Sequence, residues 1–385
     1  MSELITNRMG NYKIDQVSIE TKIDYEQIID FFYANINKIE RFLTKKDNYS
    51  NDLINGIKNK RIIFPINKHT EYYIIKNKEN LKKVYYYLLF RYKFYSAGHN
   101  KTNLGYPPYL LIEPVSTCNL RCPFCFQIDK SFTKKPYMGV MNYDLFKKIV
   151  DEANNIGVGA VTLASRGEPT LHKKLEEMIE YVAKKENIFE IKVNTNGTFL
   201  NENLCHNLLK NEVSQLVISA DHYLKDEYER LRKGAIFEKV VKNVDMLFSI
   251  KKNFYPNSIT EIRISGIDNE RNLDRKKFHD FWIKRSDHVT AGYPFERWDT
   301  YANTPHPKIN DPCENLWDRM YVWFDGKVNP CDADYKSYLS FGNLKENTIL
   351  EVWNNKSIEM IRNKHLNEDR KAIDPCNKCG ISFCQ

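Results

Sequence analysis

The chain has 385 residues, of which 42% are hydrophobic and 28% charged, a composition that excludes a disordered or fibrous protein. No run approaches the roughly eighteen apolar residues of a membrane span, and the first residues lack a signal-peptide core, so we expect a cytoplasmic protein without a membrane partner. Most of the net charge of +8 lies in residues 1–105, which hold 18 basic and 11 acidic residues. This surplus could attract an acidic partner, but the region has no nucleic-acid-binding motif, and we do not expect nucleic acid to bind.

The first hundred residues predict a separate, mostly helical region. Apolar residues recur at helical spacing over 28–42, and 81–94 predicts another helix. Between them, 61–64 and 71–75 could form two short strands. A stretch rich in Gly, Asn and Pro follows and predicts a linker, so we place an N-terminal accessory region at 1–105.

Beyond this region, short apolar runs alternate with amphipathic stretches. Six strands are expected, at 109–115, 160–164, 190–193, 215–219, 261–265 and 288–291. Helices are expected between and after them, at 143–155, 173–184, 202–210, 225–250 and 275–284. Such alternation is typical of an α/β fold with a parallel sheet, either an open doubly wound array or a partial barrel. In both, ligands bind at the C-terminal ends of the strands.

Nine cysteines without a secretory signal indicate a metal or redox site rather than a disulfide framework. Cys118, Cys122 and Cys125 follow the first expected strand with the spacing C-x3-C-x2-C. Three thiolates on one loop can each take one iron of a cubane cluster and leave the fourth iron open to an outside ligand. A zinc knuckle that takes its fourth ligand from elsewhere is the alternative.

This loop resembles the signature of the radical S-adenosylmethionine (SAM) superfamily, with Phe124 in the aromatic position before the third cysteine. The resemblance covers roughly residues 109–291. It implies a partial (β/α)6 barrel of the TIM type and a [4Fe-4S] cluster that binds SAM on its open iron. It further implies that an external one-electron reductant, such as flavodoxin or ferredoxin, drives cleavage of SAM to a 5′-deoxyadenosyl radical, which abstracts hydrogen from the substrate.

The resemblance also implies cofactor contacts at the end of the second strand. The run Ser165-Arg-Gly-Glu-Pro resembles the family's G-G-E-P motif, with Gly167, Glu168 and Pro169 in matching places and Arg166 instead of the first glycine. A carboxylate beside backbone carbonyls suits the ammonium group of SAM.

Further contacts are expected at the next two strand ends and in the loop beyond. Asn196 lies in a T-N-G segment and Ser219 in an S-x-D segment, both of which resemble family motifs near the cofactor. Arg232 could pair with the methionine carboxylate of SAM, or it could be a solvated arginine at a helix end.

A second group of cysteines follows residue 310, where the strand–helix alternation stops. The segment 322–331 predicts a hairpin with its turn at Asp325–Gly326, which would bring Cys313 and Cys331 together. Cys376 and Cys379 would complete a four-thiolate iron–sulfur or zinc site once a helix expected at 349–364 folds back.

This arrangement resembles the SPASM and twitch extensions of radical SAM enzymes. The number of cysteines matches the twitch version, with one auxiliary [4Fe-4S] cluster and these preferred ligands: Cys313, Cys331, Cys376 and Cys379, with Cys384 competing for the last place. A structural zinc ribbon is the alternative. We therefore expect a barrel at 106–305 and a small cysteine-rich domain at 306–385. Cys205, on an amphipathic helix, is expected to be a buried apolar residue.

The substrate is predicted less directly. Glu296, Arg297 and Asp299 follow the last expected strand and are candidates for substrate contact or for accepting a proton. In the family, auxiliary clusters accompany oxidation of a sugar or cyclitol alcohol, or modification of a ribosomal peptide. Because residues 1–105 show no match to a peptide-binding winged helix, we favour an oxidoreductase acting on a small hydroxylated molecule. A non-catalytic iron–sulfur protein and a zinc-stabilised nucleic-acid binder stay open, although neither needs residues such as Glu168 and Ser219 at strand ends.

Overall fold

The computed structural model of the chain describes residues 25–41, 43, 47–268, 270–292, 299–305 and 310–379. Six parallel strands form the centre of the fold: β1 Tyr109–Ile112, β2 Ala160–Leu163, β3 Glu190–Thr195, β4 Gln215–Ser219, β5 Glu261–Ile267 and β6 His288–Gly292. Each strand pairs with the next one along the chain. All six expected strands are confirmed.

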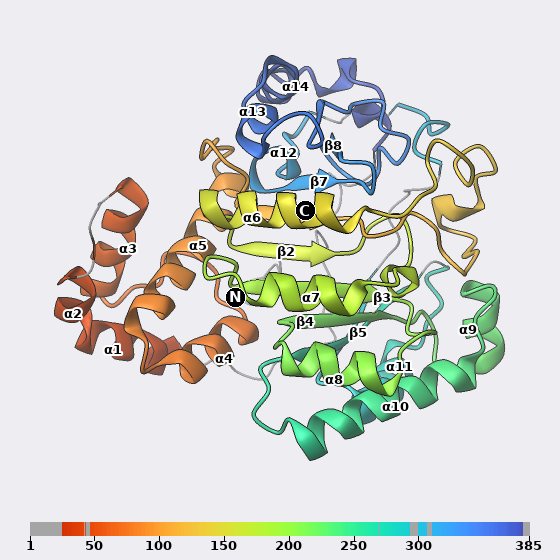
Figure 1. Cartoon of the computed structure of the whole chain (residues 1–385), viewed down its shortest axis with the longest axis horizontal. Helices are drawn as coiled ribbons and strands as arrows, with labels where there is room; N and C mark the ends of the chain where they lie inside the picture. The colour runs from red at the N-terminus through yellow and green to blue at the C-terminus, as the bar shows by residue number, and fades with distance from the viewer. Residues whose placement is uncertain are drawn as a thin grey trace.

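Helices follow the strands in regular alternation: α6 Tyr143–Ile156, α7 Leu175–Ala183, α8 Glu202–Lys210, α9 Lys225–Leu231, α10 Phe237–Phe254 and α11 Arg275–Trp282. In Figure 1, α6, α7 and α8 form one layer in front of the sheet. Because neighbouring strands follow one another in sequence, crossovers of one hand place the helices on one side of the sheet. The doubly wound alternative is therefore wrong, and the partial barrel is confirmed.

The single helix expected at 225–250 is instead two helices, α9 and α10. Gly234 lies between them with φ +99°, a backbone conformation that favours glycine. A Cβ atom at this position would lie 3.4 Å from the carbonyl oxygen of Asn119, in the loop of the first three cysteines. The break thus brings the chain against that loop.

The described part of residues 25–99 contains five helices: α1 Tyr25–Ala34, α2 Ile36–Arg41, α3 Asn48–Lys58, α4 Lys68–Asn77 and α5 Leu81–His99. The two short strands expected here are wrong. Residues 61–64 form no strand, and 71–75 lie within α4, where Tyr73 and Ile74 are buried between two exposed residues as a helix requires. Asn67 caps this helix by accepting a hydrogen bond from the backbone N–H of Thr70 at 2.8 Å.

The N-terminal helices cover the end of the barrel at which the strands begin. The Tyr87 hydroxyl of α5 donates a 2.7 Å hydrogen bond to Glu190 at the start of β3, and Arg91 pairs with the same carboxylate. Phe90 packs so closely on Gly159 that a Cβ atom there would lie 2.1 Å from its ring. Figure 1 shows α5 beside the start of β2.

The C-terminal region extends the barrel sheet with three strands: β7 Met320–Val322, β8 Lys327–Asn329 and β9 Gly342–Asn343. The expected hairpin is confirmed, with Gly326 at φ +84° in its turn. Its place was not predicted, because β7 pairs in parallel with β1 and gives a nine-stranded sheet in the described part of the chain.

The described part of this region also contains three α-helices: α12 Asn315–Asp318, α13 Ile349–Trp353 and α14 Lys356–Leu366. The single helix expected at 349–364 is therefore two helices. Thr348 caps α13 in a capping box with Glu351, and the side chain of Asn355 caps α14.

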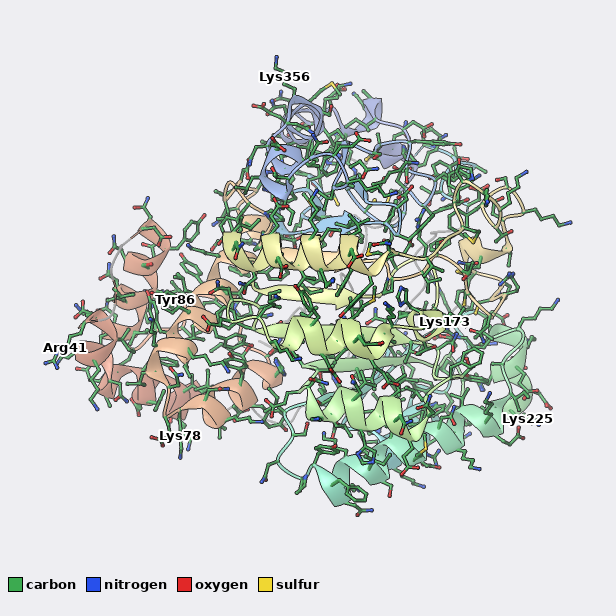
Figure 2. All side chains as sticks on the ribbon, in the orientation of Figure 1. Arg41, Lys78, Tyr86, Lys173, Lys225 and Lys356 are labelled. Atoms are coloured by element: carbon green, nitrogen blue, oxygen red, sulfur yellow. The ribbon has the colours of Figure 1, made fainter. Side chains whose placement is uncertain are left out.

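The outer surface carries much of the positive charge. In Figure 2, the side chains of Lys78, Lys225 and Lys356 lie at the outer edges of the molecule, and all three are exposed. No helix in the described part of the chain combines the length and the apolarity that crossing a membrane requires.

Candidate functional site

The first three cysteines lie together at the open end of the barrel. Cys118, Cys122 and Cys125 follow β1 and line a cavity of about 310 Å³. Burial raises the pKa of the Cys118 thiol to about 11 and that of Cys125 to about 12, with a smaller contribution from neighbouring thiols. A metal that bound here would deprotonate the thiols and remove this cost.

The cysteine loop is held by hydrogen bonds from other segments. The amide nitrogen of Asn196 donates to the Asn119 side chain at 2.9 Å and lies 3.9 Å from Cys118 Sγ. The side-chain nitrogen of Gln127 donates to the carbonyl oxygens of Ser116, at 2.7 Å, and Arg166. The loop thus has a fixed position relative to the strand ends.

Gly167 and Glu168 pack directly on this loop. A Cβ atom on Gly167 would lie 2.2 Å from the carbonyl oxygen of Val115, so only glycine permits this approach. Glu168 is buried, lines the cavity and accepts hydrogen bonds from the Thr195 hydroxyl at 2.6 Å and the Asn196 N–H at 2.7 Å. Burial raises the pKa of Glu168, against the opposing effect of these hydrogen bonds. Its carboxylate therefore joins the ends of β2 and β3 at the cavity.

Arg166, which departs from the family motif, has a clear structural role. Its guanidinium forms two 2.6 Å hydrogen bonds with the buried Glu113 and donates to the carbonyl oxygen of Tyr335 at 2.8 Å. It also lies over the Trp323 ring, 4.2 Å from its centre. Arg166 thus ties the barrel to the C-terminal region. We did not predict this link, although an acidic residue directly after an apolar strand was a signal that Glu113 needs a partner.

Ser219 and Arg232 also line the cavity. Arg232 forms an ion pair with the buried Asp221, with nitrogen and oxygen 2.5 Å apart, and its Nη1 lies 4.0 Å from Cys122 Sγ. Its guanidinium also lies over the ring of Phe124, 5.7 Å from the ring centre. The solvated alternative for Arg232 is therefore wrong, because its side chain is only 11% exposed and lies against the cysteine loop.

Other residues singled out from the sequence lie elsewhere. Pro169 is buried at the start of a short 3-10 helix and does not line this cavity. Asp299 accepts a hydrogen bond from the Tyr335 hydroxyl at 3.1 Å, also away from the cavity lining. Glu296, Arg297 and Cys384 lie outside the described residues. The catalytic roles of Glu296, Arg297 and Asp299, the cofactor contact of Pro169 and the metal-binding role of Cys384 stay predictions.

The cavity has polar atoms that a ligand could satisfy. Among the described residues, buried atoms without a hydrogen-bond partner include Ser165 Oγ, Asn194 Oδ1 and Gln127 Oε1, all from lining residues. Buried polar groups are rarely left unpaired. Three thiols on one loop beside such groups fit an iron–sulfur cluster together with a polar cofactor.

Three basic residues that we did not predict lie in the same cavity. Lys192 of β3, Arg263 of β5 and Arg319, just before β7, are all buried lining residues. The sequence signal for such residues was the alternation of polar and apolar residues along a strand. In the run Glu-Ile-Arg-Ile-Ser of β5, polar and apolar residues alternate, which places one set inside the barrel and the other under the helices.

The second group of cysteines lies in the C-terminal region. Four thiols line one small, mostly apolar cavity, those of Cys313, Cys331, Cys376 and Cys379. Burial raises the pKa of the Cys331 thiol well above its usual value, and the other three thiols raise it further. Thiols that crowd together in an apolar cavity fit a metal or cluster that takes them as thiolates.

His365 is a further possible ligand at this second site, and the sequence did not identify it. It lines the same cavity and accepts a hydrogen bond from the backbone N–H of Cys313 at 3.2 Å. Its Nε2 is buried without a partner among the described residues. Burial lowers the pKa of His365 to about 3, which keeps the ring neutral.

In the described ranges, no three His, Cys, Asp or Glu side chains are placed around a point that could hold a single metal ion. A cubane does not require this, because each of its thiolate ligands binds a different iron.

Comparisons with known proteins match the regions that hold the two groups of cysteines. The family model of the radical SAM superfamily matches residues 112–281, and that of SPASM, an iron–sulfur cluster-binding domain, matches residues 313–380. These matches confirm the resemblance inferred from the cysteine spacing.

Two curated relatives have different names. The tungsten-containing aldehyde ferredoxin oxidoreductase cofactor-modifying protein of Pyrococcus furiosus is 34% identical over 301 residues, 66% of this chain and 83% of that protein. The GTP 3′,8-cyclase of Clostridium botulinum (strain Okra) is 28% identical over 162 residues, 42% of this chain. The chain spans about half the length of this cyclase, 49%.

A solved structure shows the same fold. The structure of anSMEcpe with bound AdoMet has a TM-score of 0.54 and 19% sequence identity, and the match covers 70% of this chain and 88% of that one.

Proposed function

The chain belongs to the radical SAM superfamily and carries a C-terminal SPASM domain, and on this basis we propose that it oxidises a small hydroxylated molecule held in the barrel cavity. Family membership implies a [4Fe-4S] cluster with SAM and an auxiliary iron–sulfur cluster. We assign the first cluster to Cys118, Cys122 and Cys125.

The assignment of the auxiliary cluster follows from the second cavity. We assign this cluster to the four thiols that meet there, those of Cys313, Cys331, Cys376 and Cys379. When bound, the first cluster would supply the reductive cleavage of SAM, which gives a 5′-deoxyadenosyl radical. The auxiliary cluster would supply an electron acceptor.

The residues around the first site suit the polar groups of SAM. Glu168 presents a buried carboxylate for the ammonium group, and Ser219 and Asn194 contribute oxygen atoms from the neighbouring strands. Arg232 places a positive charge beside Cys122, which favours thiolates and a cofactor carboxylate. Because Asp221 fixes this guanidinium, it is oriented before any ligand arrives.

One observation supports the proposed oxidation: residues at or next to both cysteine sites line a single cavity. Its lining includes Cys118, Cys122 and Cys125 together with Asn315 and Asp332. Asn315 follows Cys313 by two residues, and Asp332 follows Cys331 directly. A molecule in this cavity would therefore contact residues next to both proposed clusters.

This position suits a two-electron oxidation of an alcohol to a carbonyl. The hydrogen atom on the carbinol carbon would go to the radical that SAM supplies when it is bound beside Cys118, Cys122 and Cys125, and the hydroxyl proton would go to water or a basic side chain. The remaining electron would go to the auxiliary cluster that Cys313, Cys331, Cys376 and Cys379 would hold. The buried polar side chains of the lining offer hydrogen bonds that suit a small polar substrate.

Anaerobic reconstitution with iron and sulfide tests the proposal. We expect about eight irons per chain, as two cubanes require, and release of 5′-deoxyadenosine when dithionite and SAM are added. Replacing Cys125 by Ala should abolish this release, whereas Cys205→Ala, which removes a buried thiol on α8, should not. A colourless preparation that contains zinc and releases no deoxyadenosine would refute the proposal.

A further inference from the structure

Two side chains with nitrogen donors lie among the four thiols of the second site. Arg370 and His365 both line the small cavity of these thiols. Arg370 is only 2% exposed, and His365 is fully buried. Burying a cationic side chain is unfavourable unless negative charge lies close to it. The position of Arg370 therefore indicates that this cavity is negatively charged when it is filled.

The guanidinium of Arg370 is directed by one backbone contact and acts on the thiols. Its Nη1 donates a hydrogen bond to the carbonyl oxygen of Asp311 at 2.9 Å. Its Nε is buried without a hydrogen-bond partner among the described residues, and no carboxylate of those residues forms an ion pair with it. Burial raises the pKa of the Cys313 and Cys376 thiols, and the charge of Arg370 opposes this rise. Arg370 is thus close enough to stabilise both sulfur atoms as thiolates.

His365 presents an N–H group to the same cavity. Its Nδ1 accepts a hydrogen bond from the backbone N–H of Cys313 at 3.2 Å, so this nitrogen carries no proton. The ring proton is then on Nε2, which is buried without a partner in the described part of the chain. Because the cavity is mostly apolar apart from its thiols, sulfur is the natural acceptor for this donor.

Asp334, the acidic residue in the described lining of this cavity, is bound by other groups. Its carboxylate accepts hydrogen bonds from the Tyr301 hydroxyl at 2.8 Å and from the backbone N–H groups of Tyr338, at 3.0 Å, and Leu339, at 2.7 Å. These donors spread the negative charge of Asp334 away from the thiols. The charge of Arg370 is therefore left to act on whatever the thiols bind.

We propose that Arg370 and His365 donate hydrogen bonds to sulfur atoms of the auxiliary cluster and thereby raise its reduction potential. A cubane that four thiolates hold has a net negative charge, which increases when an electron is added. A buried cation and N–H donors therefore stabilise the reduced state more than the oxidised state. The inference rests on the proposed function, in which the substrate radical would lose one electron to this cluster and one proton to water or a basic side chain as the carbonyl forms.

Potentiometric titration of the reconstituted full chain, followed by electron paramagnetic resonance, tests the proposal. The reference is the variant Cys118→Ala/Cys122→Ala/Cys125→Ala, in which the signal comes from the auxiliary cluster alone. Adding Arg370→Met should lower the ratio of reduced to oxidised cluster about tenfold at a fixed potential, a shift of about 59 mV for one electron. Arg370→Lys should retain most of the potential because it keeps the charge. Lys371→Met, the same change at the exposed neighbouring residue, should have the potential of the reference.

His365 gives a second, independent measurement. His365→Leu removes an N–H donor without changing the charge, so it should shift the potential in the same direction by a smaller amount. His365→Gln, which offers an amide N–H, should restore part of the shift. Iron content and thermal midpoints of all variants are measured alongside. If Arg370→Met does not bind the cluster, the two His365 variants decide the outcome.

Three results would overturn the proposal: an unchanged potential in Arg370→Met, a higher potential in either variant, or loss of iron in His365→Leu, which would make His365 a ligand. Deoxyadenosine release is measured on the unaltered protein from the same preparation. Release with unshifted potentials refutes the role of Arg370 and His365 alone, and shifted potentials without release refute the proposed function alone. A reference variant that reconstitutes no cluster would refute both.

Discussion

The two cysteine sites are built in opposite ways. The first takes three thiols from one loop, between Cys118 and Cys125, and faces a cavity of about 310 Å³. The second takes its thiols from segments that lie as far apart in the sequence as Cys313 and Cys379, and closes them within a small apolar cavity.

This difference indicates a division of roles. A loop that holds its own ligands can bind a cluster and leave space for a cofactor without supporting the rest of the fold. A site that collects ligands from distant segments forms only when the region folds, so its cluster also stabilises the structure. We therefore expect that replacing a cysteine of the first site abolishes activity, and that replacing a cysteine of the second site lowers the stability of the fold.

The largest effect should follow from Cys118→Ala at the first site. Deoxyadenosine release should fall at least about 10³-fold, because the cluster that cleaves SAM would lose a ligand. Iron content should fall by about half, while the thermal midpoint should change by only about 2 °C. Iron analysis, chromatography of the nucleoside and calorimetry measure these quantities. A fall in the thermal midpoint as large as that of a variant at the second site would contradict the proposed division of roles.

At the second site, Cys331→Ala should lower the thermal midpoint by roughly 5–10 °C, since a crosslink between distant segments would be lost. In this variant the other three thiols of the second site remain, those of Cys313, Cys376 and Cys379. Comparison with Cys205→Ala separates this effect from the loss of one buried thiol. If both variants melt alike, the second site does not stabilise the fold.

Replacing Arg166 tests how the barrel, which holds the first site, is joined to the C-terminal region, which holds the second. Its removal by Arg166→Met should cost about 3–5 kcal/mol of unfolding free energy, because the buried carboxylate of Glu113 would lose its ion pair. The double variant Glu113→Gln/Arg166→Met should be more stable than Arg166→Met alone. Denaturant unfolding under anaerobic conditions measures both. A double variant that is less stable would show that the link acts through the Tyr335 and Trp323 contacts instead.

The sequence predicted the parts of the molecule that depend on local pattern. The six barrel strands appeared as short apolar runs, and Cys118, Glu168 and Ser219 stood out because each lies in a loop or at a strand end. The sequence-based predictions were wrong where contacts between residues distant in the sequence determine the local structure. Residues 71–75 are rich in β-forming side chains, yet they form a helix because Asn67 caps it and one of its faces packs on α5.

Contacts between distant segments also explain what was missed at the site. The pairing of β7 with β1 has no local signal, and so the contacts of Arg166 with Tyr335 and Trp323 in the C-terminal region could not be foreseen. Lys192 and Arg263 were hidden within runs taken as apolar. Their alternation with isoleucine and valine was visible, but only a curved sheet turns that alternation into an interior lined with charge.

The smallest effect concerns the cavity of the first site and its pH dependence. Burial, Arg263 and Arg319 lower the pKa of Lys192 to about 7, from an ordinary value of 10.5. Between these two pH values the unfolded chain binds a proton that the folded chain does not, so stability rises with pH in this window. Below about pH 7 both states are protonated and this dependence disappears.

Lys192→Met removes the titrating amine and so isolates its contribution. From pH 7 to pH 9, the unfolding free energy of the parent should increase by about 1–2 kcal/mol relative to this variant. Denaturant unfolding of both proteins at several pH values gives the difference, in which other titrating groups cancel. Parallel curves would mean that Lys192 keeps an ordinary pKa. In that case the interior of the barrel would be better solvated than its burial indicates, and the contrast between an open first site and a closed second site would become sharper.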